Sequence, residues 1–378
     1  MRKAVLIPDS FKGTMSSSRI IAVMKAQILK YWPECQIVSI PVADGGEGSV
    51  DSFLTALGGE KISIRTQGPW GEEIDSFYGL LPDNTAVIEM AASAGLPLVG
   101  DRKDPSKTTT YGVGELILDA AKKGAGRIVI GLGGSATNDA GCGAAAACGV
   151  TFLDVEGKSF VPTGATLDRI ASIDLSTMDE SVRKLEITAM CDIDNPFYGP
   201  SGAAAVYGPQ KGADEEMVSF LDERMKKLSS LVESQLGIDL QAIPGSGAAG
   251  GMGGGMKAFF NARLQMGIDT VLDVTGFDDL ARGADWIFTG EGKIDSQSLR
   301  GKVVIGVARK AKRLGVPVIA VVGDIADDID AAYDEGVTGI FSINRVAVPY
   351  KEARLRAESD MALTMDNIVR FIKSVKGE

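Results

Sequence analysis

Apolar residues near the N-terminus follow two distinct patterns. Ala4–Ile7 is a continuous apolar run, and Ile20, Met24 and Ile28 then recur every four positions. The first pattern is typical of a short buried strand, and the second is typical of a helix with one buried face. A serine among residues 16–18 is expected to cap this helix.

The same order of strand, polar loop and helix is repeated at both ends of the chain. A strand over 36–40 and a helix ending at Leu57 follow the first pair, and Gly58-Gly59 stops that helix. From residue 286 the pattern predicts strands and helices at 286–288, 303–314, 316–322 and 339–342, and a basic helix closes the chain. This repetition indicates a parallel α/β domain.

The pattern changes between residues 66 and 284. Runs 74–81 and 85–90 flank Pro82-Asp83-Asn84, which indicates an antiparallel pair. Further elements are expected as a helix over 113–123, a strand over 127–130, a hairpin over 150–160, a strand over 186–190, a helix over 214–236 and a glycine-rich loop over 244–255. We therefore predict an α/β fold of two domains. Residues 1–65 and 285–378 form a parallel three-layer domain of the flavodoxin or Rossmann type, and residues 66–284 form an inserted mixed α/β domain.

The amino-acid composition excludes several types of catalysis and of binding partner. The 378 residues include no histidine, which excludes Ser-His-Asp and Cys-His nucleophile systems and imidazole-bound zinc. Acid–base chemistry must then use carboxylates, lysines or water. With 39 basic and 50 acidic residues the net charge is −11, which argues against a nucleic acid or an anionic membrane as partner. Four cysteines without a C-x-x-C pair and the lack of a long apolar segment indicate a cytoplasmic protein with reduced thiols.

Glycine is abundant, with 47 of 378 residues, and it gathers with polar residues after several predicted strands. Ligands of open parallel sheets bind beyond the carboxyl ends of the strands, so we expect these loops to converge on one site. After the first strand, Asp9, Ser10 and Lys12 offer a carboxylate, a hydroxyl and an ammonium group. The alternative is a surface loop in which serine caps the next helix. After the second strand, Asp44 and Glu47 suit Mg²⁺ or substrate hydroxyls, or else serve as helix cap and first-turn charge.

The loop Gly131–Asp139 is the most informative one. Its G-x-G-x-x-A pattern mimics a dinucleotide fingerprint, but Asn138 and Asp139 place polar groups where such a turn packs on its helix. A glycine loop at a helix N-terminus also suits a phosphate or a carboxylate. The alternative is a glycine-rich turn in which Asn138 or Asp139 caps the following helix.

Four further loops contain candidate groups. These are Asp192–Asn195, Tyr207–Gly212, Pro244–Gly251 and Thr289–Asp295. Each also has an alternative as a solvated turn or a flexible lid. A Walker A motif is absent, because Gly301-Lys302 has Ser296 at the upstream glycine position and Val303 after it.

Together these loops resemble the bacterial type-1 glycerate kinases. The matching segments are PDSFKGT (8–14), ADGGEG (43–48), GLGGSATND (131–139), CDIDNP (191–196), YGPQKGA (207–213), PGSGAAGG (244–251) and TGEGKID (289–295). They occur in the family's order over nearly the whole chain. Ala140 stands where the family commonly has glycine, and Tyr207 stands where it often has phenylalanine.

The resemblance implies transfer of the ATP γ-phosphate to D-glycerate with Mg²⁺, giving 2-phosphoglycerate, with 3-phosphoglycerate as the second choice. It also implies a site in a cleft between two domains. The sequence leaves the oligomeric state open, a homodimer included. A nicotinamide-dependent oxidoreductase of a small 2-hydroxy acid is the alternative function, and it depends on the G-x-G-x-x-A pattern alone.

The resemblance assigns roles to the loop residues. We expect catalysis from Lys12, Asp44, Asp192 and Glu291, with the three acids also as metal ligands and Asp192 as the favoured proton acceptor. The expected substrate-binding residues are Asp9, Ser10, Gly133, Gly134, Ser135, Asn138, Asp139 and Lys211. The expected nucleotide-binding residues are Gly247, Gly250, Gly251, Gly290, Gly292 and Asp295.

Overall fold

The computed structural model describes residues 1–43, 45–296, 298–375 and 377. The chain divides into two compact units, which we call the terminal unit (residues 1–43 and 266–378) and the central unit (residues 44–265). Within the described residues, no helix combines the length and the apolar character that crossing a bilayer requires.

The unit boundaries lie near residues 43 and 265, whereas the sequence pattern placed them at 65 and 284. Helix α2 (Ser49–Leu57) packs on strands β4 (Glu73–Leu80) and β5 (Thr85–Glu89) of the central unit. Helix α11 (Gly267–Val274) packs on α13 (Val303–Leu314) of the terminal unit. The packing partners of these two helices, rather than the change in pattern, decide the boundaries.

The terminal unit is a parallel α/β structure. Its elements are β1 (Lys3–Pro8), α1 (Ser17–Tyr31), β2 (Gln36–Ser39), α11, α12 (Phe277–Ala281), β11 (Trp286–Gly290), β12 (Lys293–Ile294), η5 (Ser298–Arg300), α13, β13 (Val318–Val322), β14 (Asp324–Ile325), α14 (Ala331–Asp334), β15 (Val337–Ser342) and α15 (Tyr350–Val375). The five-stranded sheet has the order β15-β13-β11-β1-β2, and each neighbouring pair is parallel. Counted along the unit, this is the 2-1-3-4-5 order of flavodoxin-like folds, as the sequence predicted.

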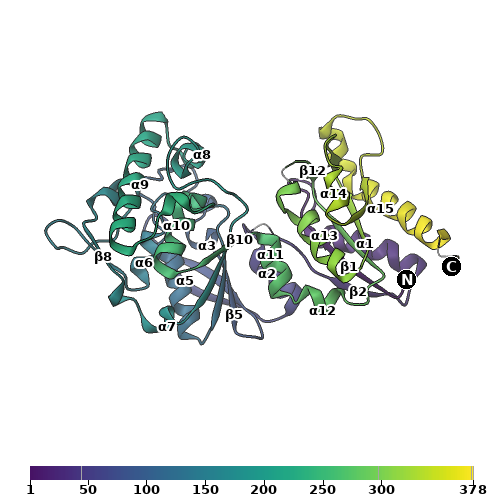
Figure 1. Cartoon of the computed structure of the whole chain (residues 1–378), viewed down its shortest axis with the longest axis horizontal. Coiled ribbons are helices and arrows are strands. Elements are labelled where there is room, and N and C mark those ends of the chain that lie inside the picture. The colour runs from purple at the N-terminus through teal and green to yellow at the C-terminus, as the bar shows by residue number, and fades with distance from the viewer. Residues whose placement is uncertain (44, 297, 376, 378) are drawn as a thin grey trace. The chain divides into compact units, whose positions relative to one another are not determined.

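Helices cover both faces of this sheet. Helices α1 and α15 lie side by side at the purple and yellow ends of the chain in Figure 1, and their apolar residues pack with Leu6 and Phe288. On the other face, α13 and α14 pack with Ala320 and Val322. Neighbouring residues of a strand point to opposite faces, so strands buried on both sides are apolar throughout. The predicted cap of α1 is Ser16, whose hydroxyl accepts a hydrogen bond from the Arg19 N–H at 3.2 Å.

The central unit is built on a mixed sheet. Its elements are α2, β3 (Glu60–Gln67), β4, β5, α3 (Ala91–Ala94), α4 (Leu96–Val99), α5 (Tyr111–Lys122), β6 (Arg127–Gly131), α6 (Cys142–Ala147), β7 (Thr151–Leu153), η1 (Gly164–Arg169), β8 (Ser172–Asp174), η2 (Leu175–Thr177), α7 (Glu180–Arg183), β9 (Glu186–Met190), α8 (Ala203–Tyr207), η3 (Pro209–Lys211), α9 (Glu215–Leu236), η4 (Leu240–Ala242), α10 (Ala248–Phe260) and β10 (Arg263–Gln265). The sheet order is β10-β9-β6-β5-β4-β3. Strands β10, β9, β6 and β5 are parallel, while β4 is antiparallel to both β5 and β3.

The glycine-rich loop predicted over 244–255 is wrong in its second half. Helix α10 occupies Ala248–Phe260, but Ala249, Gly250 and Gly251 have left-handed backbone angles, so its regular part begins at Met252. Met252 and Met256 are fully buried in the core of the central unit. Glycines form helix here because their small size lets the helix approach neighbouring backbone. A Cβ at Gly255 would lie 2.0 Å from the carbonyl oxygen of Ala140.

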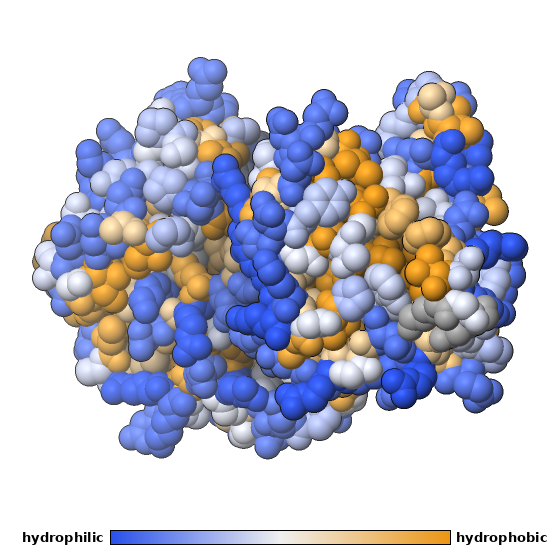
Figure 2. All heavy atoms as spheres, turned by 45° about the vertical axis from the view of Figure 1, so that its right-hand side comes forward, coloured by the Kyte–Doolittle hydropathy of each residue, from blue (hydrophilic) through white to orange (hydrophobic). Residues whose placement is uncertain are grey.

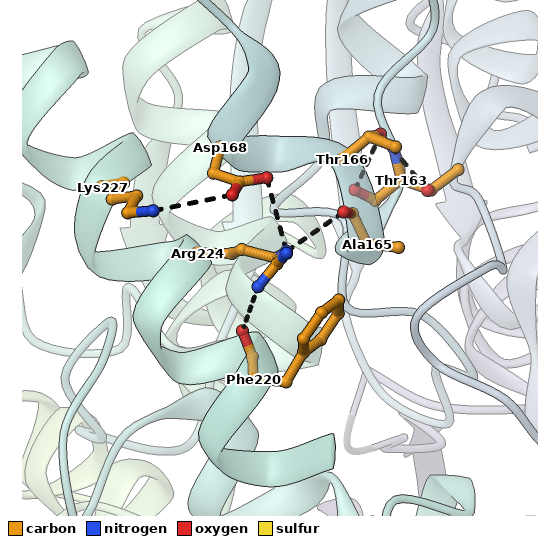
Figure 3. Close-up of polar contacts among 7 residues, drawn as sticks. All are labelled: Thr163, Ala165, Thr166, Asp168, Phe220, Arg224 and Lys227. Carbon is orange, nitrogen blue, oxygen red and sulfur yellow. Dashed lines mark hydrogen bonds and ion pairs between the residues drawn. The ribbon is translucent and has the colours of Figure 1, made fainter. Parts of the chain in front are cut away.

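Arg224 fastens α9 to η1 in the central unit (Figure 3). Its Nε donates to the Ala165 carbonyl at 3.1 Å and lies 3.4 Å from Asp168, which also lies 3.6 Å from the Lys227 ammonium. The Ala165 N–H in turn donates to the Ser106 carbonyl at 2.7 Å. These contacts hold η1 against the segment that contains Ser106.

The surface is predominantly hydrophilic on the face drawn in Figure 2, with hydrophobic residues gathered in separate patches. Leu355 and Phe371 of α15 are among the most exposed apolar residues, at 81% and 68%. The four cysteines are buried free thiols, as expected from their spacing.

Candidate functional site

In the terminal unit, two of the motif loops leave neighbouring strands. Pro8 at the end of β1 pairs with Gly290 at the end of β11, and the Asp9 N–H donates to the Gly290 carbonyl at 2.8 Å. In the 2-1-3-4-5 order, the chain reverses direction across the sheet between these two strands, and the crevice beyond their carboxyl ends is the usual ligand site. The segments that begin with Asp9 and Glu291 therefore leave the sheet at its topological switch point.

Glu291 has the environment of a cation ligand. Its side chain is 5% exposed, and its Oε1 atom is buried without a hydrogen-bond partner among the described residues. Burial, reinforced by the negative charge of Asp9, raises the pKa of Glu291 to about 7. A buried carboxylate oxygen without a donor is stabilised by a positive charge, so Glu291 is suited to bind a metal ion.

The loop after β1 forms a hollow of about 430 Å³ lined by residues 10–16. Phe11 anchors the loop, because its side chain is buried and its N–H donates to the Met15 carbonyl at 2.8 Å. Lys12 is exposed, and α1 begins beside the hollow at Ser17. An ammonium group next to a helix N-terminus favours an anionic ligand. Since Ser16 caps α1, Ser10 does not have the capping role that was its alternative.

In the central unit, the motif loops gather beyond the carboxyl ends of β6 and β9, where Gly131 pairs with Met190. A Cβ at Gly131 would lie 2.2 Å from the Gly45 carbonyl oxygen, which accepts a hydrogen bond from the Gly133 N–H at 2.9 Å. Loop 45–48 thus rests directly on loop 131–139, and glycine is required where the two backbones touch. Asp44, the predicted metal ligand of this segment, lies outside the described residues.

Lys211 lies beneath loop 131–139. Its side chain is 2% exposed, and its Nζ contacts the Ser135 hydroxyl at 2.8 Å and the Thr137 carbonyl at 2.7 Å. Burial lowers the pKa of Lys211 to about 7, although Asp139 opposes the change. Lys211 therefore reaches the surface of the site only through Ser135, rather than contacting a ligand as a surface charge.

Asn138 and Asp139 are fully buried and point away from solvent. The Asp139 carboxylate accepts hydrogen bonds from the N–H groups of Thr110 at 2.7 Å, Gly141 at 3.2 Å and Gly143 at 3.3 Å. Burial raises the pKa of Asp139, and these donors oppose the change. The N-cap residue of α6 is Gly141, so Asp139 is not the cap itself. Its bonds to the Gly141 and Gly143 N–H groups hold the N-terminal end of that helix.

Asn138 faces the core rather than the surface. Its Nδ2 lies 3.2 Å from the Met225 sulfur, and its Oδ1 has no partner among the described residues. In loop 131–139, only Gly133 and Gly134 remain open to solvent, with Ser135 at 6% exposure beside them. Within this loop, a ligand therefore has access mainly at Gly133 and Gly134.

Loop 244–251 packs on two other motif loops. The Gly247 N–H donates to the Asn195 carbonyl at 3.1 Å, and the Gly250 carbonyl accepts from the Ala140 N–H at 3.1 Å. Ala249, Gly250 and Gly251 have φ angles of 53°, 69° and 86°. Gly247, Gly250 and Gly251, which were predicted to bind the nucleotide, are buried. Gly247 and Gly250 lie against backbone, and Gly251 lies against the side chains of Met225 and Phe197.

Asn195 joins the turn 191–196 to the segment that begins with Tyr207. Its Oδ1 accepts a hydrogen bond from the Tyr207 hydroxyl at 2.6 Å, and its Nδ2 donates to the Ser201 carbonyl at 2.9 Å. Asp192, three residues before Asn195, is exposed. The two hydrogen bonds of Asn195 therefore hold the turn in place, and the exposed carboxylate on the same turn is that of Asp192.

The predicted residues fall into two groups. Asp9, Ser10, Lys12, Gly290, Glu291, Gly292 and Asp295 belong to the terminal unit, whereas Gly133, Gly134, Ser135, Asn138, Asp139, Asp192, Lys211, Gly247, Gly250 and Gly251 belong to the central unit. The expected nucleotide-binding glycines are divided between the units.

Glu89 is a buried polar residue that the sequence analysis missed. It ends β5 beside Gly131, and its carboxylate accepts a hydrogen bond at 2.7 Å from the Val50 N–H in the first turn of α2. Burial raises the pKa of Glu89. An acidic residue that ends a buried apolar strand was the available signal, since the strand over 85–90 was itself predicted.

The fold gives no support to the dinucleotide interpretation of loop 131–139. After β6 and α6 the chain enters β7, which pairs antiparallel with β8 in a separate two-stranded sheet. A dinucleotide-binding unit instead returns to a parallel strand of the same sheet.

Comparisons with known proteins all point to the same family, and each covers most of the chain. A family model described as the Glycerate kinase family matches residues 4–373. The chain is 44% identical over 373 residues to the glycerate kinase of Bacillus cereus, covering 98% of each chain, and 40% identical over 343 residues to the glycerate 2-kinase of Escherichia coli, covering 90% of each. A crystal structure assigned to glycerate kinase 2 from Salmonella typhimurium LT2 is similar over 100% of both chains, with a TM-score of 0.87 and 38% identity.

Proposed function

The chain belongs to the glycerate kinase family, and we propose that it transfers the γ-phosphoryl group of ATP to D-glycerate, forming 2-phosphoglycerate in the cytoplasm. The observation that carries the proposal is the similarity to glycerate kinases over nearly the full length of the chain. The name of the Escherichia coli relative, glycerate 2-kinase, favours the 2-hydroxyl over the 3-hydroxyl.

Mg²⁺ is the metal that we propose for the reaction. Glu291 of the terminal unit fits it, because one oxygen of its buried carboxylate has no donor among the described residues. Asp192 of the central unit is a separate candidate, an exposed acid on a turn that Asn195 holds in place. In kinases, Mg²⁺ is commonly bound by one or two carboxylates that act with the nucleotide phosphates. When bound, the metal neutralises charge on the phosphates.

The two units offer different groups to the substrates. The loop that contains Lys12 offers an ammonium group beside a helix N-terminus, which suits a phosphate. Gly134 and Ser135 offer backbone N–H groups that no acceptor uses within the described residues, and these suit the carboxylate of glycerate. Phosphoryl transfer depends mainly on such positioning and on charge stabilisation.

One assay tests the proposal. The protein is mixed with Mg-ATP and D-glycerate, ADP formation is followed, and the product is compared with 2- and 3-phosphoglycerate standards by phosphorus NMR. We expect glycerate-dependent ADP and the 2-phosphate. ADP formation that does not depend on glycerate would contradict the function, and the 3-phosphate would correct only the position.

A further inference from the structure

Ser135 and Lys211 form a buried hydroxyl–amine pair at the edge of the accessible glycines. Their Oγ and Nζ atoms are 2.8 Å apart, within hydrogen-bonding distance, and both side chains are largely buried. The pair is fixed in place, because Lys211 belongs to η3 and its Nζ also bonds to the Thr137 carbonyl at 2.7 Å.

The hydrogen bonds of Lys211 decide in which direction a proton can move. A carbonyl oxygen only accepts, so the contact with Thr137 uses one N–H of the amine. When Lys211 is neutral, its lone pair is then free to accept the Ser135 O–H. Burial lowers the pKa of Lys211 to about 7, so a large part of the molecules hold the neutral amine near neutral pH.

The charged groups around the amine do not replace it as proton acceptor. Asp139 faces it, but the Asp139 carboxylate is already occupied by donors from Thr110, Gly141 and Gly143. Lys103 lies on the adjacent segment, and its Nζ donates to the Gln210 carbonyl at 3.3 Å. Lys211 is therefore the proton acceptor that Ser135 contacts.

Ser135 lies beside backbone N–H groups that are suited to bind the substrate. Gly134, its neighbour, is exposed, and the N–H groups of both residues lack acceptors in the described part of the chain. A carboxylate bound to these N–H groups would bring its adjacent carbon, with the hydroxyl on that carbon, toward the side chain of Ser135. In glycerate that adjacent hydroxyl is the 2-hydroxyl.

We propose that Ser135 and Lys211 relay the proton of the glycerate 2-hydroxyl. This proposal rests on the function proposed above. The hydroxyl gives its proton to the Ser135 Oγ, and Ser135 gives its own proton to the Lys211 Nζ. The glycerate oxygen bonds to the γ-phosphorus while the bond from that phosphorus to the ADP oxygen breaks, and its electron pair leaves with ADP. Lys211 later returns its proton through Ser135 to water. A lysine, rather than the expected carboxylate Asp192, is then the final proton acceptor.

The test is the pH dependence of kcat/KM for D-glycerate between pH 5.5 and 9 at saturating Mg-ATP. In the wild type, kcat/KM should rise tenfold per pH unit below about pH 7 and level off above it, because only the neutral amine accepts a proton. Ser135→Ala and Lys211→Met should lower the plateau by about 10²-fold and remove this acid limb. Ser135→Thr, which keeps a hydroxyl, should keep the limb.

Lys103→Met is the matched control, since it removes a neighbouring ammonium group that does not contact Ser135. Its acid limb should be unchanged. Ser135→Ala removes one oxygen atom and is the decisive variant if Lys211→Met does not fold. An acid limb that persists in Ser135→Ala overturns the relay and leaves the kinase function in place. A wild-type protein without glycerate-dependent ADP formation overturns the function and the relay together.

Discussion

Lys211 makes the stability of this protein depend on pH. Burial lowers its pKa to about 7 in the folded state, against 10.5 in an exposed lysine. Between these values the unfolded chain binds one more proton than the folded chain, so the free energy of unfolding increases with pH. Relative to Lys211→Met, wild-type stability should rise by about 1.4 kcal/mol per pH unit from pH 7 to 9.5. Urea unfolding at a series of pH values measures this difference.

Lys103→Met is the control for that series, because it also removes one lysine ammonium group, and the Lys103 side chain is exposed rather than buried. Its stability difference from the wild type should be the same at each pH. A Lys211→Met difference that does not change with pH would show that the folded protein keeps Lys211 charged.

Tyr207 stabilises the turn that contains Asp192 through one hydrogen bond. Its hydroxyl donates to the Asn195 Oδ1 at 2.6 Å, and Tyr207→Phe removes the donor while keeping the ring. We expect the free energy of unfolding to fall by about 1 kcal/mol, measured by urea unfolding. Tyr198→Phe is the matched control, since the Tyr198 hydroxyl has no hydrogen bond among the described residues. Equal losses in both variants would show that the Asn195 contact contributes nothing.

At the scale of single residues, sequence reasoning found the loops but not the direction of each side chain. Asn138 and Asp139 lie in a loop that the sequence analysis singled out, yet both are buried, and Asp139 bonds to the first turn of α6. Their direction depends on Thr110 and Met225, which are distant in sequence. Burial of Lys211 likewise depends on contacts more than 70 residues away, so spacing alone suggested only an exposed charge.

At the scale of elements, the glycines of α10 are fixed by what the helix touches. A Cβ at Gly255 would lie 2.0 Å from the Ala140 carbonyl oxygen, whereas a Cβ at Gly126 would meet nothing within 4 Å. Alanine is favoured over glycine inside a helix by about 1 kcal/mol, but the contact with backbone cannot relax easily. Gly255→Ala should therefore lower the free energy of unfolding by about 2 kcal/mol or more.

Gly126→Ala provides the comparison, because Gly126 is exposed and has no positive φ. We expect its effect on the free energy of unfolding to remain within about 1 kcal/mol. A Gly255→Ala protein as stable as Gly126→Ala would mean that α10 moves away from loop 131–139 at little cost.

The elements that were predicted well have strong local signals. Apolar runs that end in glycine or acidic residues identified β1, β6, β11 and β13, and a four-residue repeat identified α1. Strand β3 was missed although its sequence EKISIRTQ alternates polar and half-buried residues, because it contains only two apolar residues and lies at the edge of the sheet. The pairing of β7 with β8 was also missed, because β8 follows 18 residues after β7 ends and is only three residues long.

At the scale of the whole molecule, the motif loops belong to two separately packed units. The terminal unit contributes PDSFKGT and TGEGKID at its switch point, and the central unit contributes the loops beyond β6 and β9. An enzyme with a net charge of −11 that takes two anionic substrates needs local positive charge. Lys12 is an exposed ammonium group on one of these loops, and Asp192 is an exposed carboxylate on another, suited to a metal ion.

If the reaction uses both units, then one substitution in either unit should be enough to stop turnover. We expect Lys12→Ala and Asp192→Asn each to lower kcat by at least about 10²-fold in the glycerate-dependent ADP assay, because each removes a charge that the proposed function uses, Lys12 for a phosphate and Asp192 for the metal ion. Both residues are exposed on loops, so the melting temperature should not change. Lys25→Ala on α1 and Asp194→Asn on the same turn as Asp192 are matched controls that should keep normal kcat. A normal kcat in Lys12→Ala would remove the terminal-unit loop from the reaction, and a normal kcat in Asp192→Asn would do the same for the turn in the central unit.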